Sequence, residues 1–205
     1  MNVLVPGRRR PVRPDSLHVL RGRKTRRRIL DAARARILGE GYENLRLDML
    51  AQDAGVTKAA VVKSVGGKAS ILLALGDEDR QERVRVIREA LGLRTALRKR
   101  LADAIRRMLM LDSARLNVVI PYIGHMWFWS GADHDRAQAM LDETRAHLRE
   151  LVAAASRTRL SAAATDTIAL RVMSGYALAL RDLYYRRTPI EEAVNLVTGH
   201  ALGEQ

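Results

Sequence analysis

The stretch from residue 47 to residue 65, LDMLAQDAGVTKAAVVKSV, limits the possible folds more than any other part of this chain. Its first half has apolar residues at i, i+3, i+4 and i+7, the spacing of one face of a helix. These residues are Leu47, Leu50, Ala51 and Ala54. Gly55 follows them, where a helix ends most easily in a left-handed residue that glycine tolerates. Thr57 can then cap a second helix with its hydroxyl, so the sequence predicts two short helices joined by a tight turn.

The second predicted helix has an inward and an outward face. Val61 and Val65 lie at i and i+4 and are expected to face the core. The outward positions hold Lys58, Ala59, Lys63 and Ser64. Two helices around a glycine turn, the second presenting lysine and small side chains, are typical of a helix-turn-helix with its recognition helix. An ordinary helical hairpin inside an all-helical domain stays the alternative.

Composition excludes several classes of protein. The 205 residues suffice for one large or two small domains. The absence of cysteine excludes a disulfide framework and thiolate catalysis. No apolar run approaches the roughly 20 residues that cross a bilayer, and no apolar region follows the N-terminal arginines as in a secretory signal. We therefore expect a cytoplasmic protein with no membrane partner.

The placement of charge indicates a polyanionic partner. The net charge is +13. Residues 1–75 hold 16 Lys and Arg against 6 Asp and Glu, whereas residues 76–205 hold 20 against 17. The excess therefore lies on the third of the chain that carries the helix-turn-helix pattern. Because neutralising phosphates releases counterions, we expect this part to bind double-stranded DNA.

Residues 1–22 are predicted to be a disordered basic arm. They contain Pro6, Gly7, Pro11, Pro14 and the run Arg8-Arg9-Arg10. Such an arm can contact the DNA backbone or minor groove, and a solvated tail is the alternative. Residues 23–40 are predicted to form the first helix, with Ile29, Ala33 and Ile37 on its apolar stripe. Arginines crowd its first turns, where positive charge opposes the helix dipole, which indicates phosphates nearby.

About residues 24–75 resemble the DNA-binding domain of the tetracycline-repressor (TetR) family of bacterial regulators. The resemblance rests on the order and spacing of Ile29, Leu30, Ala32, Ala33, Gly41, Tyr42, Leu50, Ala51, Ala54, Gly55, Val56, Thr57, Val61 and Lys68. It implies a DNA-binding head followed by a helical body whose sequence diverges freely within the family. Together with the basic patterns above, it gives a predicted DNA-binding set of Arg23, Arg26, Arg27, Arg46, Thr57, Lys58, Ala59, Ala60, Lys63, Ser64 and Lys68.

The recognition helix departs from the family pattern. Val62 stands where the family usually has a tyrosine, and Ser64-Val65 stands where it usually has a His-Phe pair. In the family, that tyrosine and histidine commonly contact phosphates. Arg46, Lys58 and Lys63 are able to supply such contacts here. The alternative is a helical sensor or adaptor that has lost specific DNA binding.

Residues 67–205 are predicted to form the helical body. Amphipathic patterns predict helices at residues 68–92, 93–111, 134–157, 162–187 and 190–202. Between them, residues 115–130 hold Tyr122, Trp127, Phe128 and Trp129, four of the eight aromatic residues of the chain. Pro121 and Gly124 interrupt the helical pattern of this stretch.

Aromatic and Met side chains around a broken helix are typical of the wall of an apolar cavity. The predicted ligand-contacting set is Met108, Tyr122, His125, Met126, Trp127, Trp129, Met140, Met173 and Tyr176. Plain packing in the core or in a dimer interface is the alternative for these residues.

The last two predicted helices have broad apolar faces. The resemblance implies that they pair across a two-fold axis in a homodimer. Gly175 and Ala179, a small-residue pair at i and i+4, permit another helix to approach closely. The alternative is that both helices only cover the core of the monomer.

Together these patterns predict an all-α fold, with an N-terminal three-helix helix-turn-helix head at residues 23–66 and a C-terminal helical ligand-binding and dimerisation domain at residues 67–205. The resemblance implies a ligand-responsive transcriptional regulator, most often a repressor, released from its operator by a small apolar or aromatic effector. The chain has no nucleophile–base–orienter set, no paired carboxylates in its apolar stretches and no spacing of metal ligands. We therefore expect no enzymatic activity, no catalytic residue, no metal and no cofactor.

Overall fold

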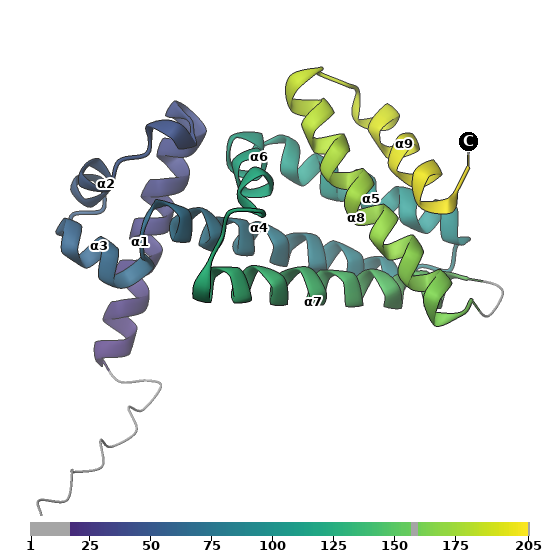
Figure 1. Ribbon diagram of the computed structural model, residues 1–205, viewed down its shortest axis with the longest axis horizontal. Coiled ribbons are helices and arrows are strands. Elements are labelled where there is room, and N and C mark those ends of the chain that lie inside the picture. The colour runs from purple at the N-terminus through teal and green to yellow at the C-terminus, as the bar shows by residue number, and fades with distance from the viewer. Residues whose placement is uncertain (1–16, 157–159, 205) are drawn as a thin grey trace, which may run out of the picture.

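The computed structural model describes residues 17–156 and 160–204, which form α-helices, one 3-10 helix and no strand (Figure 1). The all-α prediction is therefore confirmed. The elements are α1 (Leu17–Glu40), η1 (Tyr42–Asn44), α2 (Leu47–Asp53), α3 (Lys58–Val65), α4 (Lys68–Leu91), α5 (Leu97–Ser113), α6 (Leu116–His125), α7 (Gly131–Ala155), α8 (Ala162–Tyr185) and α9 (Ile190–Leu202).

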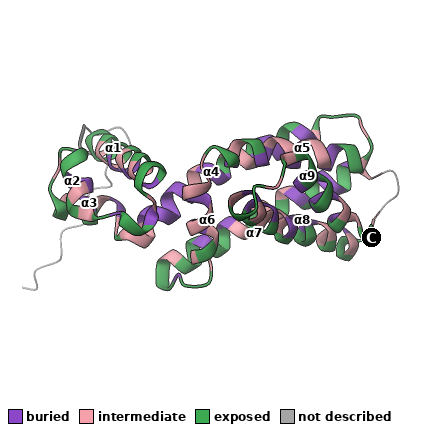
Figure 2. Cartoon of the chain, turned by 90° about the horizontal axis from the view of Figure 1, so that it is seen from above, coloured by how far each residue is buried: buried purple, intermediate pink, exposed green. Residues whose placement is uncertain are grey.

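The helices are arranged as a head and a body. The head contains α1, η1, α2 and α3, and the body contains α5 to α9 (Figure 1). Helix α4 runs from the head into the body, where it lies beside α7. Buried positions follow α4 from one part to the other (Figure 2), so this helix is the main mechanical link between them.

The turn between α2 and α3 has the predicted geometry. Gly55 has a φ of 60°, in the left-handed region. Thr57 caps α3, because its Oγ1 accepts a hydrogen bond of 3.1 Å from the backbone N–H of Ala60. Val61 and Val65 are buried against the head core, which confirms their predicted orientation.

The hydrophobic core of the head continues into the body without a break. One cluster joins the buried residues of α1, α2, α3 and the first turns of α4 to Val118 and Tyr122 of α6 and to Met140 of α7. The ring of Tyr122 lies against the backbone of α4 at Gly76, where an added Cβ atom would overlap the ring carbons. Any side chain at this position would therefore push α6 away from α4.

A second cluster fills the body between α4, α5, α7, α8 and α9. Gly175 belongs to the contact between α8 and α9 of the same chain. A Cβ atom there would lie 3.3 Å from Cδ2 of His200 and 3.5 Å from Cγ1 of Val197. The close helix approach predicted at Gly175 therefore occurs within one chain, because α9 folds back onto this side of α8.

Several helix boundaries differ from the sequence prediction, and α7, for example, begins at Gly131 instead of residue 134. Helix α1 begins at Leu17, so residues 17–22 are helical instead of part of a disordered arm. No proline follows Pro14 in this region, so nothing in the sequence stops the helix from extending to Leu17. Residues 1–16 lie outside the described part of the chain. Helix α5 begins at Leu97 instead of residue 93, because residues 92–96 form the turn after α4.

No single described helix is long and apolar enough to cross a membrane. Helices α3 and α4 pass such a test only as a pair, with a bend of 51° between them. The apolar stretch of that pair, residues 71–75, is buried in the head core.

Candidate nucleic-acid interface

Helix α3 presents a compact basic face to solvent. Lys58, Ala59, Val62 and Lys63 are exposed, whereas Ala60 and Ser64 are half-buried. The structure therefore brings four of the predicted DNA-contacting residues together at the surface of α3, namely Thr57, Lys58, Ala59 and Lys63. Lysine at the first position of a helix opposes the helix dipole, so Lys58 does not serve helix stability. Val62 is exposed beside these residues but was not among those predicted to contact DNA.

Two arginines of α1 donate hydrogen bonds to backbone carbonyls of the helix-turn-helix. Nη1 of Arg26 donates a hydrogen bond of 2.8 Å to the backbone carbonyl of Ser64, in the last turn of α3. Nη2 of Arg28 donates to the backbone carbonyl of Ala54, at the end of α2. Guanidinium groups stabilise these carboxyl ends because the helix dipole is negative there. Arg26 was predicted to contact DNA, but its side chain is engaged in this structural contact.

Arg27 and Arg46 make ion pairs at the surface. Nε of Arg27 lies 3.0 Å from a carboxylate oxygen of Asp31, and its Nη1 lies 3.5 Å from a carboxylate oxygen of Glu78. Nη2 of Arg46 lies 2.7 Å from Oδ2 of Asp48, and this hydrogen bond holds the pKa of Asp48 below its ordinary value. Ion pairs between exposed side chains contribute little to stability, so a phosphate can replace any of these carboxylates.

Lys68 and Arg23 differ in their surroundings. Nζ of Lys68 donates a hydrogen bond of 2.8 Å to the backbone carbonyl of Glu43 and lies 4.6 Å from the centre of the Tyr42 ring. Lys68 therefore ties the start of α4 to η1. Arg23 is exposed on the outer turns of α1 and makes no ion pair within the described residues, which leaves its charge accessible.

The sequence of this region matches a family model. Residues 29–75 match the model described as "Bacterial regulatory proteins, tetR family". This match assigns residues 29–75 to the N-terminal domain of the TetR family. This match covers α1 from its first buried residue, the helix-turn-helix and the apolar start of α4. Members of the family are DNA-binding transcriptional regulators.

Solved structures of transcriptional regulators share the fold of most of the chain. PfmR of Thermus thermophilus is 19% identical, with a TM-score of 0.64 over 86% of this chain and 98% of its own. FadR of Bacillus subtilis, in complex with stearoyl-CoA, is 15% identical, with a TM-score of 0.67 over 87% and 99%. FadR of Thermus thermophilus, a repressor in complex with lauroyl-CoA, is 15% identical, with a TM-score of 0.69 over 86% and 93%. At these identities the likeness shows the fold alone. None of the curated proteins compared with the chain matches it.

Buried ion pairs join the head of the chain to its body. Nη1 of Arg34, on α1, lies 2.9 Å from Oδ1 of Asp79 on α4. Nη1 of Arg115, just before α6, lies 2.6 Å from the same oxygen. Asp79 is 1% exposed, so its negative charge depends on these two guanidinium groups.

The same network continues across the body. Asp112 of α5 is completely buried, and both of its oxygens accept hydrogen bonds from Nη1 of Arg83, at 3.0 and 2.9 Å. The hydroxyl of Tyr176 on α8 donates a third bond of 2.8 Å to Oδ2. Burial, together with the nearby Asp112, raises the pKa of Tyr176 well above its ordinary value, so the phenol stays protonated. Nε of Arg115 lies 4.0 Å from Oδ1 of Asp112, which connects this group with Asp79.

The predicted ligand-contacting residues do not meet in one place. Tyr122, Trp129 and Met140 are buried in the cluster that the head shares with α6 and α7, and Met126 packs against it. Met108 belongs to the body cluster, and Met173 and Tyr176 pack against it. The sequence could not separate the two groups, because both show the same apolar helical spacing.

Two members of the predicted ligand set have other surroundings. Trp127 is 85% exposed, because α6 ends at His125 and the chain turns outward before α7. It therefore does not line a cavity. His125 is half-buried at the contact between α6 and the head, with its Nε2 3.4 Å from the hydroxyl of Tyr42 and its Nδ1 3.2 Å from the carbonyl of Pro121.

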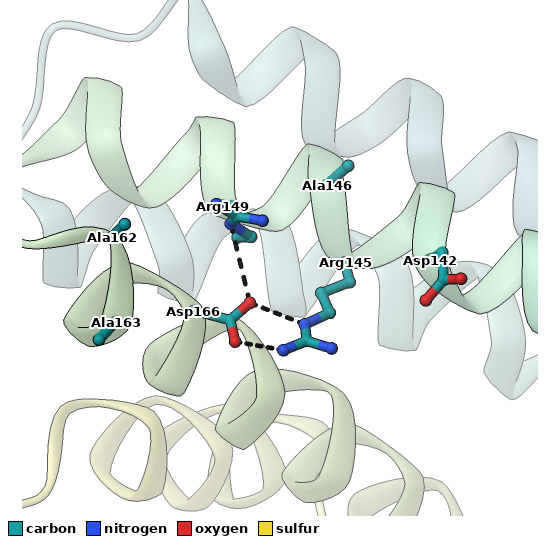
Figure 3. Close-up of a pocket in the computed structure, with 7 residues that line it drawn as sticks. All are labelled: Asp142, Arg145, Ala146, Arg149, Ala162, Ala163 and Asp166. Atoms are coloured by element: carbon teal, nitrogen blue, oxygen red, sulfur yellow. Dashed lines mark hydrogen bonds and ion pairs between the residues drawn. The ribbon is translucent and has the colours of Figure 1, made fainter.

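A surface pocket of about 530 Å³ lies between α7 and α8 (Figure 3). Arg145 and Arg149 of α7 converge there on Asp166 of α8. Nε of Arg145 donates a hydrogen bond of 2.7 Å to Oδ1 of Asp166, and Nε of Arg149 lies 3.7 Å from the same oxygen. These contacts hold the two helices together and partly neutralise both arginines, so we assign the pocket a structural role.

Proposed function

We propose that this chain is a homodimeric, ligand-responsive repressor of the TetR family that acts in the cytoplasm and is released from its operator by a small apolar or aromatic effector. The observation that carries the proposal is the exposed basic face of α3, because its lysines have no structural role within the head. Two copies of α3 would enter successive major grooves, about 34–36 Å apart. Arg23, Arg27 and Arg46 would add phosphate contacts around them.

The apolar surface of α8 and α9 supports a homodimer. Leu170 and Leu178 of α8 and Leu196 of α9 are large apolar side chains that are 44%, 61% and 59% exposed. Leu178 and Leu196 also line a mostly apolar groove of about 250 Å³ between the two helices. Exposed apolar surface of this extent marks an interface more often than a solvated face. A second copy related by a two-fold axis would place the same surface opposite itself.

The contact between the head and the body supports a response to an effector. The head core continues into α4, α6 and α7. The buried ion pairs continue from α1 to α4 and, through Arg115, to Asp112 of α5. An effector that moved α6 relative to α4 would therefore change the orientation of α3. Such coupling between two sites typically amounts to about 1–3 kcal/mol, which changes the affinity for DNA by roughly 5- to 150-fold.

Two of the structural relatives suggest the first effectors to test. Their structures contain stearoyl-CoA and lauroyl-CoA. Long-chain acyl-CoAs fit the proposed apolar effector in their acyl part. We therefore propose them as probes for this chain.

A mobility-shift experiment tests the proposal. The full chain is titrated onto the DNA upstream of its own gene at a fixed salt concentration, with and without each acyl-CoA. We expect a specific complex in excess unlabelled competitor DNA, and its loss on adding an effector. A complex that unrelated DNA displaces equally well would contradict repressor function.

A helical sensor without specific DNA binding is the second candidate. It is favoured by the engagement of Arg26 and Lys68 in contacts within the chain and by the half-burial of Ala60 and Ser64. These four residues were predicted to contact DNA. The same experiment separates the candidates, because a sensor would show no specific complex under any condition.

A further inference from the structure

The exposed face of α3 has an apolar centre. Val62 is 48% exposed and is the large apolar side chain that this helix presents to solvent. An α-helix turns about 100° per residue, so Val62 and Ala59 lie in the middle of the exposed arc. Lys58 and Lys63 lie at its two edges.

The remaining polar groups of α3 are turned away from this centre. The hydroxyl of Thr57 accepts the capping hydrogen bond from the N–H of Ala60. Ser64 is half-buried on the side of α1, where its carbonyl accepts from Arg26. The exposed face of α3 also contains no Arg, Asn or Gln, the side chains that bond most specifically to guanine and adenine edges.

The chemistry of the major groove offers one partner for such a centre. Each base pair presents hydrogen-bonding groups there, and thymine alone adds an apolar group, its C5-methyl. A valine flanked by alanine can pack on this methyl group. The two lysines lie far enough apart on the arc to contact phosphates on both sides of the groove or a guanine at its edge.

We propose that Val62, with Ala59 beside it, selects thymine in the operator by packing against its C5-methyl group. This inference rests on the DNA binding proposed above and names the chemistry by which α3 would distinguish sequences. It gives Val62 a role in specificity, whereas Lys58 and Lys63 supply most of the electrostatic affinity.

The test begins with selection of duplexes from a random library by the full chain. Each conserved thymine of the selected site is then replaced by deoxyuridine, which lacks only the C5-methyl group. We expect about a fourfold loss of affinity at one or two positions in each half-site, the ratio that corresponds to burial of one methyl group. A duplex with 5-methylcytosine at the same position should bind the protein more tightly than a duplex with cytosine there.

Val62→Ala provides the second arm of the experiment. Alanine is the better helix former, so the variant is expected to fold. It should bind the thymine site more weakly than the unmodified protein does and should lose the distinction between thymine and deoxyuridine, because the two changes remove the same contact. Met110→Ala, a change on α5 at a side chain that is 57% exposed, is the matched control and should keep the distinction.

The outcomes separate this inference from the function on which it rests. Selection that yields no preferred sequence would overturn the proposed repressor and this inference with it. A preferred sequence whose affinity is unchanged by deoxyuridine at every thymine would overturn the inference alone. Equal sensitivity to deoxyuridine in the Val62→Ala variant would show that another group contacts the methyl and would also overturn it.

Discussion

Tyr176→Phe is the sharpest test of the buried network, because it removes one hydroxyl and leaves the ring in place. The hydroxyl donates one of three hydrogen bonds to the carboxylate of Asp112, which is completely buried. A hydrogen bond to a charged group contributes about 1.5–3 kcal/mol. We therefore expect the free energy of unfolding to fall by about that amount.

The assay is equilibrium unfolding in urea, with the free energy extrapolated to water. All variants are compared at one protein concentration, since dimer formation would make stability depend on it. Tyr185→Phe is the matched control, because it is the same change on the same helix at a side chain that is 65% exposed. It should change the free energy of unfolding very little.

Asp112→Ala extends the test. This change leaves the guanidinium of Arg83 and the hydroxyl of Tyr176 buried without their shared acceptor. Removing one partner of a buried ion pair typically costs about 3–5 kcal/mol, so it should destabilise more than Tyr176→Phe. Equal unfolding free energies for Tyr176→Phe and Tyr185→Phe would refute the reasoning, because the buried hydroxyl would then contribute nothing.

Three further changes have definite expected outcomes. Lys58→Ala combined with Lys63→Ala should weaken operator binding by at least about 1–3 kcal/mol and should reduce the salt dependence of binding. An unchanged affinity in a titration at several salt concentrations would contradict the role of α3. Leu196→Glu should shift the protein towards monomer in light scattering at micromolar concentration, because the interface would bury an unpaired charge. An unmutated protein that is already monomeric would contradict the proposed interface. Gly76→Ala should destabilise the fold by about 1–3 kcal/mol, because the added methyl group overpacks against Tyr122. In a Tyr122→Ala background the same change should be neutral or stabilising. Denaturation curves without this reversal would contradict the contact.

The sequence predicted those features that depend on a few neighbouring residues. The left-handed Gly55 and the Thr57 cap follow from rules of helix ends, and the buried positions of Val61 and Val65 follow from helical spacing. The all-α class follows from the same periodicity. These interactions span at most one or two helical turns, so no knowledge of the tertiary fold was needed.

Features that depend on distant contacts could not be predicted. Arg26 and Arg28 belong to a basic run that indicates phosphate contacts, yet the fold places carbonyl groups of Ser64 and Ala54 beside them. Trp127 lies in an aromatic-rich stretch of the kind that lines cavities, but the chain turns after the end of α6 and leaves the side chain exposed. In each case a packing partner that is remote in sequence decides the role of the side chain.

The same limit applies to the boundary between the head and the body. The sequence indicates a division near residue 66, where Gly66-Gly67 separates two helical patterns, and this division stays a prediction. The hydrophobic cluster of the head crosses that point and includes Tyr122 and Met140. An independently moving head would have to expose part of this cluster to water.

The buried ion pairs set the cost of such a movement. A rotation of the head that separated Arg34 from Asp79 would leave a carboxylate that is 1% exposed with Arg115 as its remaining partner. Because closely packed contacts of this kind favour discrete arrangements over continuous bending, the head should switch between orientations that each satisfy Asp79. The proposed effector would therefore have to stabilise a second arrangement of α4 and α6 around this carboxylate. Its binding free energy would need to supply only the difference in free energy between the two arrangements. Coupling free energies of this kind are typically about 1–3 kcal/mol.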